Sequence, residues 1–114
     1  MVSPRRGEVW LVDLSPTQGH EQAGRRPALV VSADAFNRSR AGLVFVVPLT
    51  ARSQGIPTHV EVRPPQGGLH ETSWARCEDL RSVSIERLTT RPLGVVSSEV
   101  LVATGERLRL LLQL

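Results

Sequence analysis

The order of apolar and polar positions divides the first 80 residues into five short apolar or alternating runs, each closed by turn-forming residues. Runs of this length, bounded by glycine, proline, serine or aspartate, are typical of β-strands. Residues 43–49 are apolar throughout, which predicts a central strand, whereas residues 58–62 alternate and predict a strand with one face in water. The predicted strands span residues 8–14, 28–32, 43–49, 58–62 and, with a less regular pattern, 74–80.

A helical repeat of apolar residues begins near the C-terminus, where the apolar side chains of residues 97–114 fall close to one stripe of the expected helix. Ser97 or Ser98 is the expected N-cap, and Glu99 lies in the first turn, where negative charge is favourable. Gly105 in the interior costs about 1 kcal/mol relative to alanine, so the continuity of the helix through this position is left open. The predicted stripe consists of Leu101, Thr104, Leu108, Leu111 and Leu112.

Short, mostly antiparallel strands followed by one helix predict a mainly β fold with a C-terminal helix, in the form of a small, strongly curved barrel with the helix packed at one end. A length of 114 residues fits a single domain over residues 1–114. The chain opens without a signal-like leader, and its longest apolar run is too short to cross a bilayer. We therefore expect a cytoplasmic protein without a membrane partner, and the lone Cys77, which cannot form an internal disulfide, agrees with a reducing compartment.

The net charge of the chain is +3, and all 14 basic residues are arginines. Guanidinium groups present forked donors that suit phosphate oxygens, which makes nucleic acid the first partner to consider. Other chemistries lack their patterns: the three histidines and Cys77 show no zinc-like spacing, no motif surrounds a nucleophile, and no phosphate-binding loop is present. We expect no metal and no cofactor, and interpret Cys77 as a small buried hydrophobe.

Polar side chains gather at the ends of the predicted strands. Together they offer a base, cations and a hydroxyl on loops of one small sheet, which is the set that metal-free cleavage of RNA requires. In that reaction the ribose 2′-hydroxyl attacks the adjoining phosphate, a base takes its proton, and an acid protonates the leaving oxygen. The residues concerned are His20, Glu21, Gln22, Arg25, Arg26, Thr50, Arg52, Ser73, Arg76, Glu78 and Arg81.

Several of these residues fall within motifs that resemble the MazF/PemK (Kid-like) family of type II toxin–antitoxin toxins. The first motif covers residues 6–38 and contains GHEQ with RP at a fixed distance behind it; the later ones are VPLT, PTHVEV and SWARCEDLRSVSIERL. The likeness extends from Arg6 to Leu88. It implies a homodimeric SH3-like barrel of the MazF/PemK/CcdB type that cuts single-stranded RNA such as mRNA at short sequences. It also implies a cognate antitoxin that silences the toxin, in a complex that binds DNA.

The resemblance also implies roles for individual residues. In the MazF branch, the arginine before proline and the threonine that closes the third strand are the catalytic pair, which carries over to Arg26 and Thr50. In the PemK and Kid branch, the histidine of GHEQ and an R-C-D triplet carry over to His20, Arg76 and Glu78, with glutamate in place of the aspartate. We expect Arg26 to stabilise the charge on the phosphorane and Thr50 to donate a hydrogen bond to a phosphate oxygen.

The two proton transfers leave alternatives open. Glu78 is the expected base for the 2′-hydroxyl if partial burial raises its pKa, with Glu21 as the alternative. The acid is either His20 or Arg76, and we prefer His20, with Arg76 as a clamp, because a guanidinium gives up protons poorly. The residues expected to hold the RNA are Glu21, Gln22, Arg25, Arg52, Ser53, Ser73 and Arg81.

A second class of function stays open beside the enzyme. The same barrel suits a non-catalytic toxin that binds and inhibits a protein target, as CcdB toxins do with gyrase, or an antitoxin-bound regulator of its own operon. Both alternatives leave Arg26 and Thr50 without a chemical task. Incubation with a long RNA in the presence of a chelator distinguishes them from a nuclease.

Overall fold

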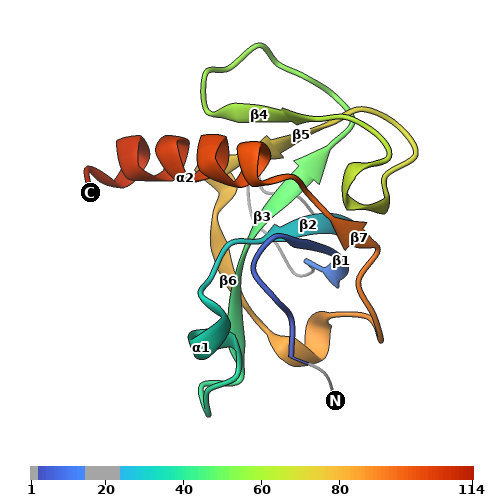
Figure 1. Cartoon of the computed structure of the whole chain (residues 1–114), viewed down its shortest axis with the longest axis vertical. Helices are drawn as coiled ribbons and strands as arrows, with labels where there is room; N and C mark the ends of the chain where they lie inside the picture. Colours follow the sequence, from blue (N-terminus) through green and yellow to red (C-terminus); the bar gives the residue numbers. More distant parts are fainter. Residues whose placement is uncertain (1–2, 15–23) are drawn as a thin grey trace.

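The computed structural model describes residues 3–14 and 24–114, so the predictions for His20, Glu21 and Gln22 lie outside the described residues. Within that part, strands dominate and a long helix closes the chain, as expected for a mainly β fold (Figure 1). The strands are β1 (Glu8–Asp13), β2 (Arg25–Val30), β3 (Leu43–Thr50), β4 (His59–Val62), β5 (Ser73–Arg76), β6 (Arg81–Ser84) and β7 (Gly94–Val95). The helices are α1 (Asp34–Asn37) and α2 (Ser98–Leu112), and the 3-10 turns are η1 (Gln66–Gly68), η2 (Cys77–Asp79) and η3 (Ile85–Arg87).

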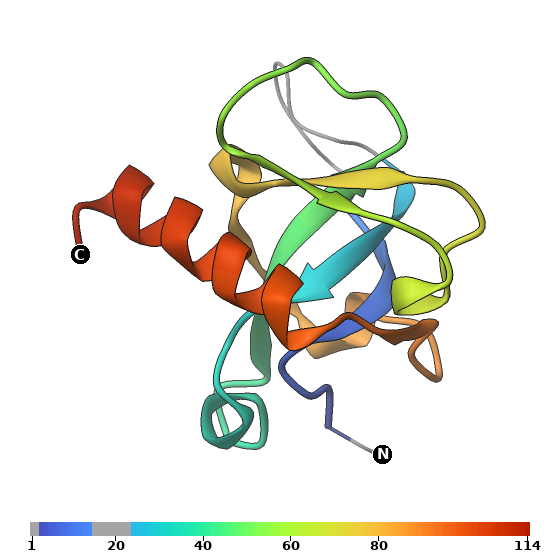
Figure 2. The ribbon, with the colours of Figure 1, turned by 45° about the horizontal axis from the view of Figure 1, so that its top comes forward.

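The described strands form an antiparallel sheet with β3 at its centre. The order along the sheet is β4-β5-β3-β2-β1-β7, and β6 pairs with the first half of β3. The prediction that residues 43–49 form the central strand is confirmed, since β3 bonds to β2, β5 and β6. With eight residues, β3 is long enough to pair with β6 at one end and β5 at the other, and the sheet curls into a half-barrel (Figure 2).

Alternate residues of this sheet enter two hydrophobic clusters of the described residues, because successive side chains of a strand point to opposite faces. Val9, Leu29 and Val47 belong to the cluster on the side of α2, which adds Val100. Trp10 and its neighbours belong to the other cluster, enclosed by β1, β2, β3 and β6. Because the sheet is curled, each of its two faces therefore lines a separate hydrophobic cluster.

Helix α2 confirms the predicted C-terminal helix, identifies Ser97 as its N-cap, and settles the continuity through Gly105 that the sequence left open. The hydroxyl of Ser97 accepts a hydrogen bond from the amide of Val100 at 3.2 Å. The helix then runs without interruption through Gly105 to Leu112. Within residues 3–14 and 24–114, no helix is long and apolar enough to span a membrane.

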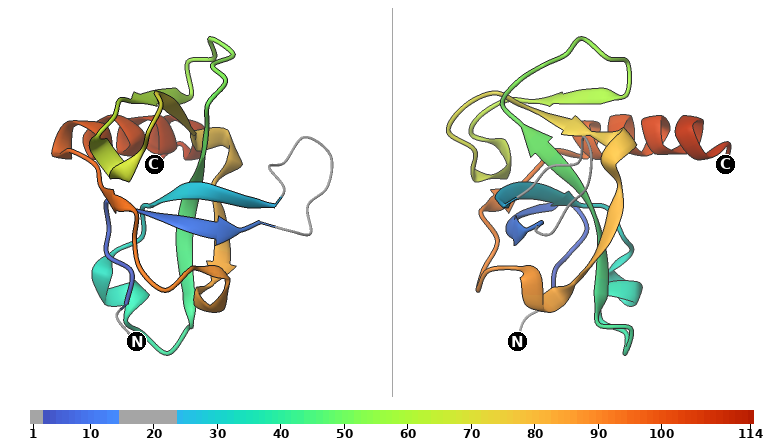
Figure 3. Two further views of the ribbon diagram at one scale, coloured as in Figure 1. Left: turned by 90° about the vertical axis from the view of Figure 1, so that its right-hand side faces the viewer. Right: turned by 180° about the vertical axis from the view of Figure 1, so that it is seen from behind.

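The inward-facing stripe of α2 is shorter than predicted. Thr104 is buried, and Leu101 and Leu108 pack against the cluster on the sheet, but Leu111 and Leu112 are 42% and 53% exposed. The C-terminal end of α2 projects past the edge of the sheet (Figures 1 and 3). Its last leucines therefore have no strand beneath them.

The strand predicted over residues 74–80 is wrong beyond Arg76. There β5 ends, the η2 turn follows, and the separate strand β6 begins at Arg81. The amide of Leu80 donates to the carbonyl of Cys77 at 3.2 Å, which closes the turn. The turn redirects the chain, because β5 pairs with β4 whereas β6 pairs with the first half of β3. A single apolar pattern in the sequence therefore covers two strands that have different pairing partners. Neither β6 nor β7 was predicted, and β2 begins three residues earlier than expected.

Candidate active site

Three neighbouring strands place polar side chains on one face of the sheet. Thr50 of β3 pairs with Trp74 of β5, which pairs in turn with Glu61 of β4. Further along β5, Arg76 pairs with His59 of β4. Paired residues of antiparallel strands point to the same side, so these five side chains share a face. The opposite face of the same strands belongs to the cluster on the side of α2.

Arg26 lies near the beginning of β2, beside the end of β3 that carries Thr50. The β2–β3 register pairs Ala28 with Pro48, and the same register continued by two residues brings Arg26 level with Thr50. Arg26 is exposed, whereas Thr50 is half-buried, with its hydroxyl oxygen accepting a hydrogen bond from the amide of Arg52 at 3.2 Å. The two residues expected to form the catalytic pair thus occupy neighbouring strand ends.

Glu78 contacts three side chains, from the residue before β4, the start of β4 and the end of β5. Its Oε1 accepts a hydrogen bond from the hydroxyl of Thr58 at 2.7 Å, and its Oε2 lies 2.9 Å from Nε2 of His59. Nε of Arg76 is 3.5 Å from the same Oε2, an ion-pair distance without the alignment of a hydrogen bond. The η2 turn makes these contacts possible, because it coils the chain after β5 and brings Glu78 back to the start of β4.

Burial by itself raises the pKa of Glu78, but hydrogen bonds from Thr58 and His59 outweigh it, and the pKa lies below the ordinary 4.5. The condition under which Glu78 was the expected base, a pKa raised by partial burial, is therefore not met. Donors to a carboxylate stabilise its charged form, and here the Glu78 side chain is still 31% exposed and keeps part of its hydration. Glu78 is ionised at neutral pH and is a weak base there.

His59 is a member of this cluster that sequence reasoning missed. Its side chain is 2% exposed, and its Nδ1 is buried without a hydrogen-bond partner among the described residues. The signal was present in the alternation of residues 58–62, which places His59 on the same face as Glu61. With its ring enclosed and Nε2 against a carboxylate, His59 is held in one orientation and helps to fix the position of Glu78.

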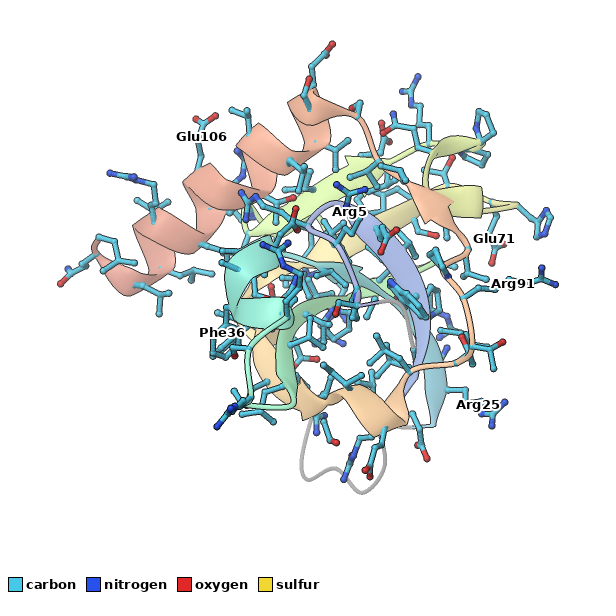
Figure 4. All side chains as sticks on the ribbon, turned by 60° about the horizontal axis from the view of Figure 1, so that its bottom comes forward. Arg5, Arg25, Phe36, Glu71, Arg91 and Glu106 are labelled. Atoms are coloured by element: carbon cyan, nitrogen blue, oxygen red, sulfur yellow. The ribbon has the colours of Figure 1, made fainter. Side chains whose placement is uncertain are left out.

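The other residues expected to bind RNA are dispersed. Arg52 and Ser53 are exposed in the loop that follows β3, and Arg25 points outward at the rim of the barrel (Figure 4). Ser73 is 5% exposed on the opposite face of β5, where its hydroxyl donates to the carbonyl of Glu71 at 3.2 Å. The structure therefore does not bring Ser73 to the face of Thr50.

Arg81, at the first position of β6, contacts Leu14, the residue that follows β1. Its Nη1 donates to the carbonyl of Leu14 at 3.4 Å. Among the described residues, Arg81 is thus bonded to the end of the first strand rather than to the Glu78 cluster.

Cys77 lies between Arg76 and Glu78 in the sequence but is 1% exposed on the side of α2. Burial is the main cause that raises the pKa of its thiol to about 11, so the thiol stays protonated at neutral pH. Its interpretation as a small buried hydrophobe is confirmed. In the part of the chain that the structure describes, no three side chains of histidine, cysteine, aspartate or glutamate are placed to hold a metal ion.

Known proteins resemble this chain in both sequence and structure. The family model of the PemK-like, MazF-like toxin of type II toxin–antitoxin systems matches residues 5–112. The chain is 41% identical over 115 residues to the endoribonuclease MazF9 of Mycobacterium tuberculosis, with 96% of this chain and 97% of the relative covered. It is 33% identical over 111 residues to the endoribonuclease EndoA of Bacillus subtilis, with 96% and 95% covered.

Solved structures share the fold. MazF from Deinococcus radiodurans matches with a TM-score of 0.88 at 30% identity, over 100% of both chains. An endoribonuclease in complex with its cognate antitoxin, from a mycobacterial species, matches with a TM-score of 0.78 at 28% identity, over 100% of this chain and 97% of that one. The expected MazF-type barrel is confirmed. Because the family model spans nearly the whole chain and the relatives are matched over almost their full length, the chain belongs to the MazF/PemK family of toxin endoribonucleases.

Proposed function

We propose that this protein cuts single-stranded RNA at short specific sequences without a metal ion. The observation that carries the proposal is the gathering of Arg26, Thr50 and Arg76 at neighbouring positions on β2, β3 and β5. Two guanidinium groups and a hydroxyl in such an arrangement can bind a phosphodiester and stabilise the charge that develops on it. The relatives named endoribonucleases support the same class of substrate.

The reaction starts with attack of the ribose 2′-oxygen on the adjoining phosphorus. The bond from phosphorus to the 5′-oxygen breaks, leaving a 2′,3′-cyclic phosphate on the upstream fragment and a 5′-hydroxyl on the downstream one. Arg26 stabilises the added negative charge, and Thr50 donates a hydrogen bond to a non-bridging oxygen. Arg76, held near Glu78, clamps the same phosphate.

The lowered pKa of Glu78 disfavours this residue as the base, because a base is most effective when its pKa is close to the operating pH. We assign the proton of the 2′-hydroxyl to Glu21, the alternative expected from the sequence. His20 protonates the leaving 5′-oxygen. Glu78 then acts as a positioning residue for Arg76.

The partners in this proposal are a second copy of the chain and a cognate antitoxin. Large apolar side chains are exposed on both β3 and α2, among them Phe45 at 38% and Leu112 at 53%. A homodimer that covers such side chains removes apolar area from water. Similar structures, one named as an endoribonuclease in complex with its cognate antitoxin and another as MazE-MazF, support the antitoxin. Light scattering that shows a monomer at micromolar concentration would contradict the dimer.

The test of the nuclease proposal incubates pure protein with a long single-stranded RNA in the presence of EDTA. Fragments with 2′,3′-cyclic phosphate and 5′-hydroxyl ends are expected. A substrate with one 2′-deoxy nucleotide just upstream of the mapped cut should bind normally yet resist cleavage, because it lacks the attacking oxygen and keeps its phosphate contacts. Cleavage of that substrate at a comparable rate would overturn the 2′-hydroxyl mechanism. Intact RNA together with retained toxicity in cells would indicate a toxin that binds a protein target.

A further inference from the structure

Trp74 is the aromatic side chain that lies beside Thr50 and is partly open to solvent. The chain has four aromatic residues, all within the described residues. Trp10 is 3% exposed in the enclosed cluster, and Phe36 and Phe45 pack against each other with ring centroids 5.5 Å apart. Phe45 and Thr50 are five positions apart on β3, so they point to opposite faces. Figure 4 shows Phe36 on the side of the barrel away from Arg25 and the start of β2.

The register of the strands places Trp74 directly beside Thr50. Because β5 lies between β3 and β4, Trp74 stands between Thr50 on one side and Glu61 on the other, with Arg76 two residues further along the same face. Directly paired residues of antiparallel strands have Cβ atoms about 5 Å apart. The Trp74 side chain is half-buried, so part of it is open to solvent. An aromatic surface is thus available one strand away from the hydroxyl that is proposed to bind the scissile phosphate.

We propose that Trp74 stacks on the base of a nucleotide adjoining the scissile phosphate and so contributes to the choice of RNA sequence. This inference rests on the proposed nuclease function. Bases of single-stranded RNA are unstacked and are bound by proteins through stacking on aromatic side chains. Contacts between arginines and phosphates hold the strand but carry no information about the base. Because preferences at such a site follow stacking strength, and purines offer the larger ring system, Trp74 favours a purine at this position.

Two substitutions separate stacking from packing. Trp74→Leu keeps an apolar side chain but removes the flat ring, whereas Trp74→Phe keeps a ring. We expect Trp74→Leu to raise KM for RNA roughly 5- to 150-fold, the loss that removal of one base stack gives, with a smaller change in kcat. When cleavage sites in a random RNA pool are mapped, the purine preference beside the cut should weaken for Trp74→Leu and persist for Trp74→Phe. Equal behaviour of the two folded variants, or an unchanged cleavage pattern for Trp74→Leu, would overturn the proposal.

A second measurement uses the unsubstituted protein and does not depend on whether Trp74→Leu folds. Tryptophan emission is titrated with fully 2′-O-methylated oligoadenylate and oligouridylate, which lack the attacking hydroxyl and are not cut by the proposed chemistry. We expect quenching at lower concentrations of oligoadenylate, and its absence in Trp74→Phe, because the remaining Trp10 is buried. If the tryptophan emission does not change during the titration, the stacking proposal is overturned, whether or not the anisotropy of a labelled oligonucleotide reports binding. Failure of the unsubstituted protein to cut RNA is recorded in the separate nuclease test, so the two proposals can fail independently.

Discussion

His59 and Glu78, 19 positions apart in the chain, meet with Nε2 of the histidine 2.9 Å from Oε2 of the glutamate. Thr58 adds a hydrogen bond to the other oxygen, and Arg76 approaches the first one. These contacts join the start of β4 to the end of β5 and the turn behind it. They fix the carboxylate in its ionised form beside Arg76, which is why we assign Glu78 to positioning rather than to proton transfer.

Arg26→Ala and Thr50→Ala should each lower kcat/KM for RNA cleavage by about 100-fold or more, because each removes one contact to the transition state. Neither side chain is buried, so thermal unfolding should change little. Arg40→Ala, at an exposed position between α1 and β3, is the matched control and should cleave normally. Near-normal cleavage by a folded Arg26 or Thr50 variant would remove that residue from the site.

Glu21→Gln and Glu78→Gln should differ in activity if Glu21 is the base. Loss of a general base costs about 10²- to 10⁴-fold, so Glu21→Gln should lose most of kcat. Glu78→Gln keeps an oxygen for the Thr58 hydroxyl and should lose roughly fivefold, about 1 kcal/mol for one altered hydrogen bond. The pH dependence of kcat/KM should lose its acidic limb in Glu21→Gln only. The reverse order of effects would return the role of base to Glu78.

Glu78 should also make folding stability depend on pH. Its folded-state pKa is lowered from 4.5, so its stabilising contribution is present above about pH 4.5 and is lost as the pH falls through the lower folded value. The difference in the free energy of unfolding between the unsubstituted protein and Glu78→Gln should therefore shrink in acid. Urea unfolding at about pH 6 and about pH 3 measures it. In Thr58→Val, which removes a donor, the pH dependence should be smaller. A difference that is the same at both pH values would contradict the lowered pKa.

Gly105→Ala should stabilise the protein by about 1 kcal/mol, because alanine is the better helix former. Apart from its chain neighbours and the nearby backbone of the helix, no heavy atom of the described residues lies within 4 Å of the position that its Cβ would take. Thermal unfolding should show a Tm higher by several degrees. The contrasting variant is Gly94→Ala, whose Cβ would come 2.4 Å from the amide nitrogen of Gly68 and should lower Tm. If Gly105→Ala instead has a lower Tm than the unsubstituted protein, this helix face has no room for the added methyl group.

The order of apolar and polar residues along the chain was sufficient to predict those elements whose hydrophobic period is uninterrupted. The apolar run over residues 43–49 predicted β3, and the stripe after Ser97 predicted a capped helix, whose continuity through Gly105 only the structure decided. Both follow from which faces a strand or a helix must bury, and that depends only on neighbouring positions. The motifs of residues 6–38 are local in the same sense, and the family that they indicated is confirmed by the match over residues 5–112. The roles of Arg26 and Thr50 remain predictions that the substitutions above address.

Only the tertiary structure decided which polar groups meet and what their environment does to them. The strand-like pattern in the sequence continues from Trp74 to Leu80. In the structure, the η2 turn ends the strand at Arg76 and brings Glu78 to His59. The direction of the Glu78 pKa shift depends on the Thr58 and His59 donors set against burial, and therefore on contacts about 20 residues apart that no local pattern encodes. The sequence by itself determined the periods, the cap and the motif; the packing of one strand against another determined the site.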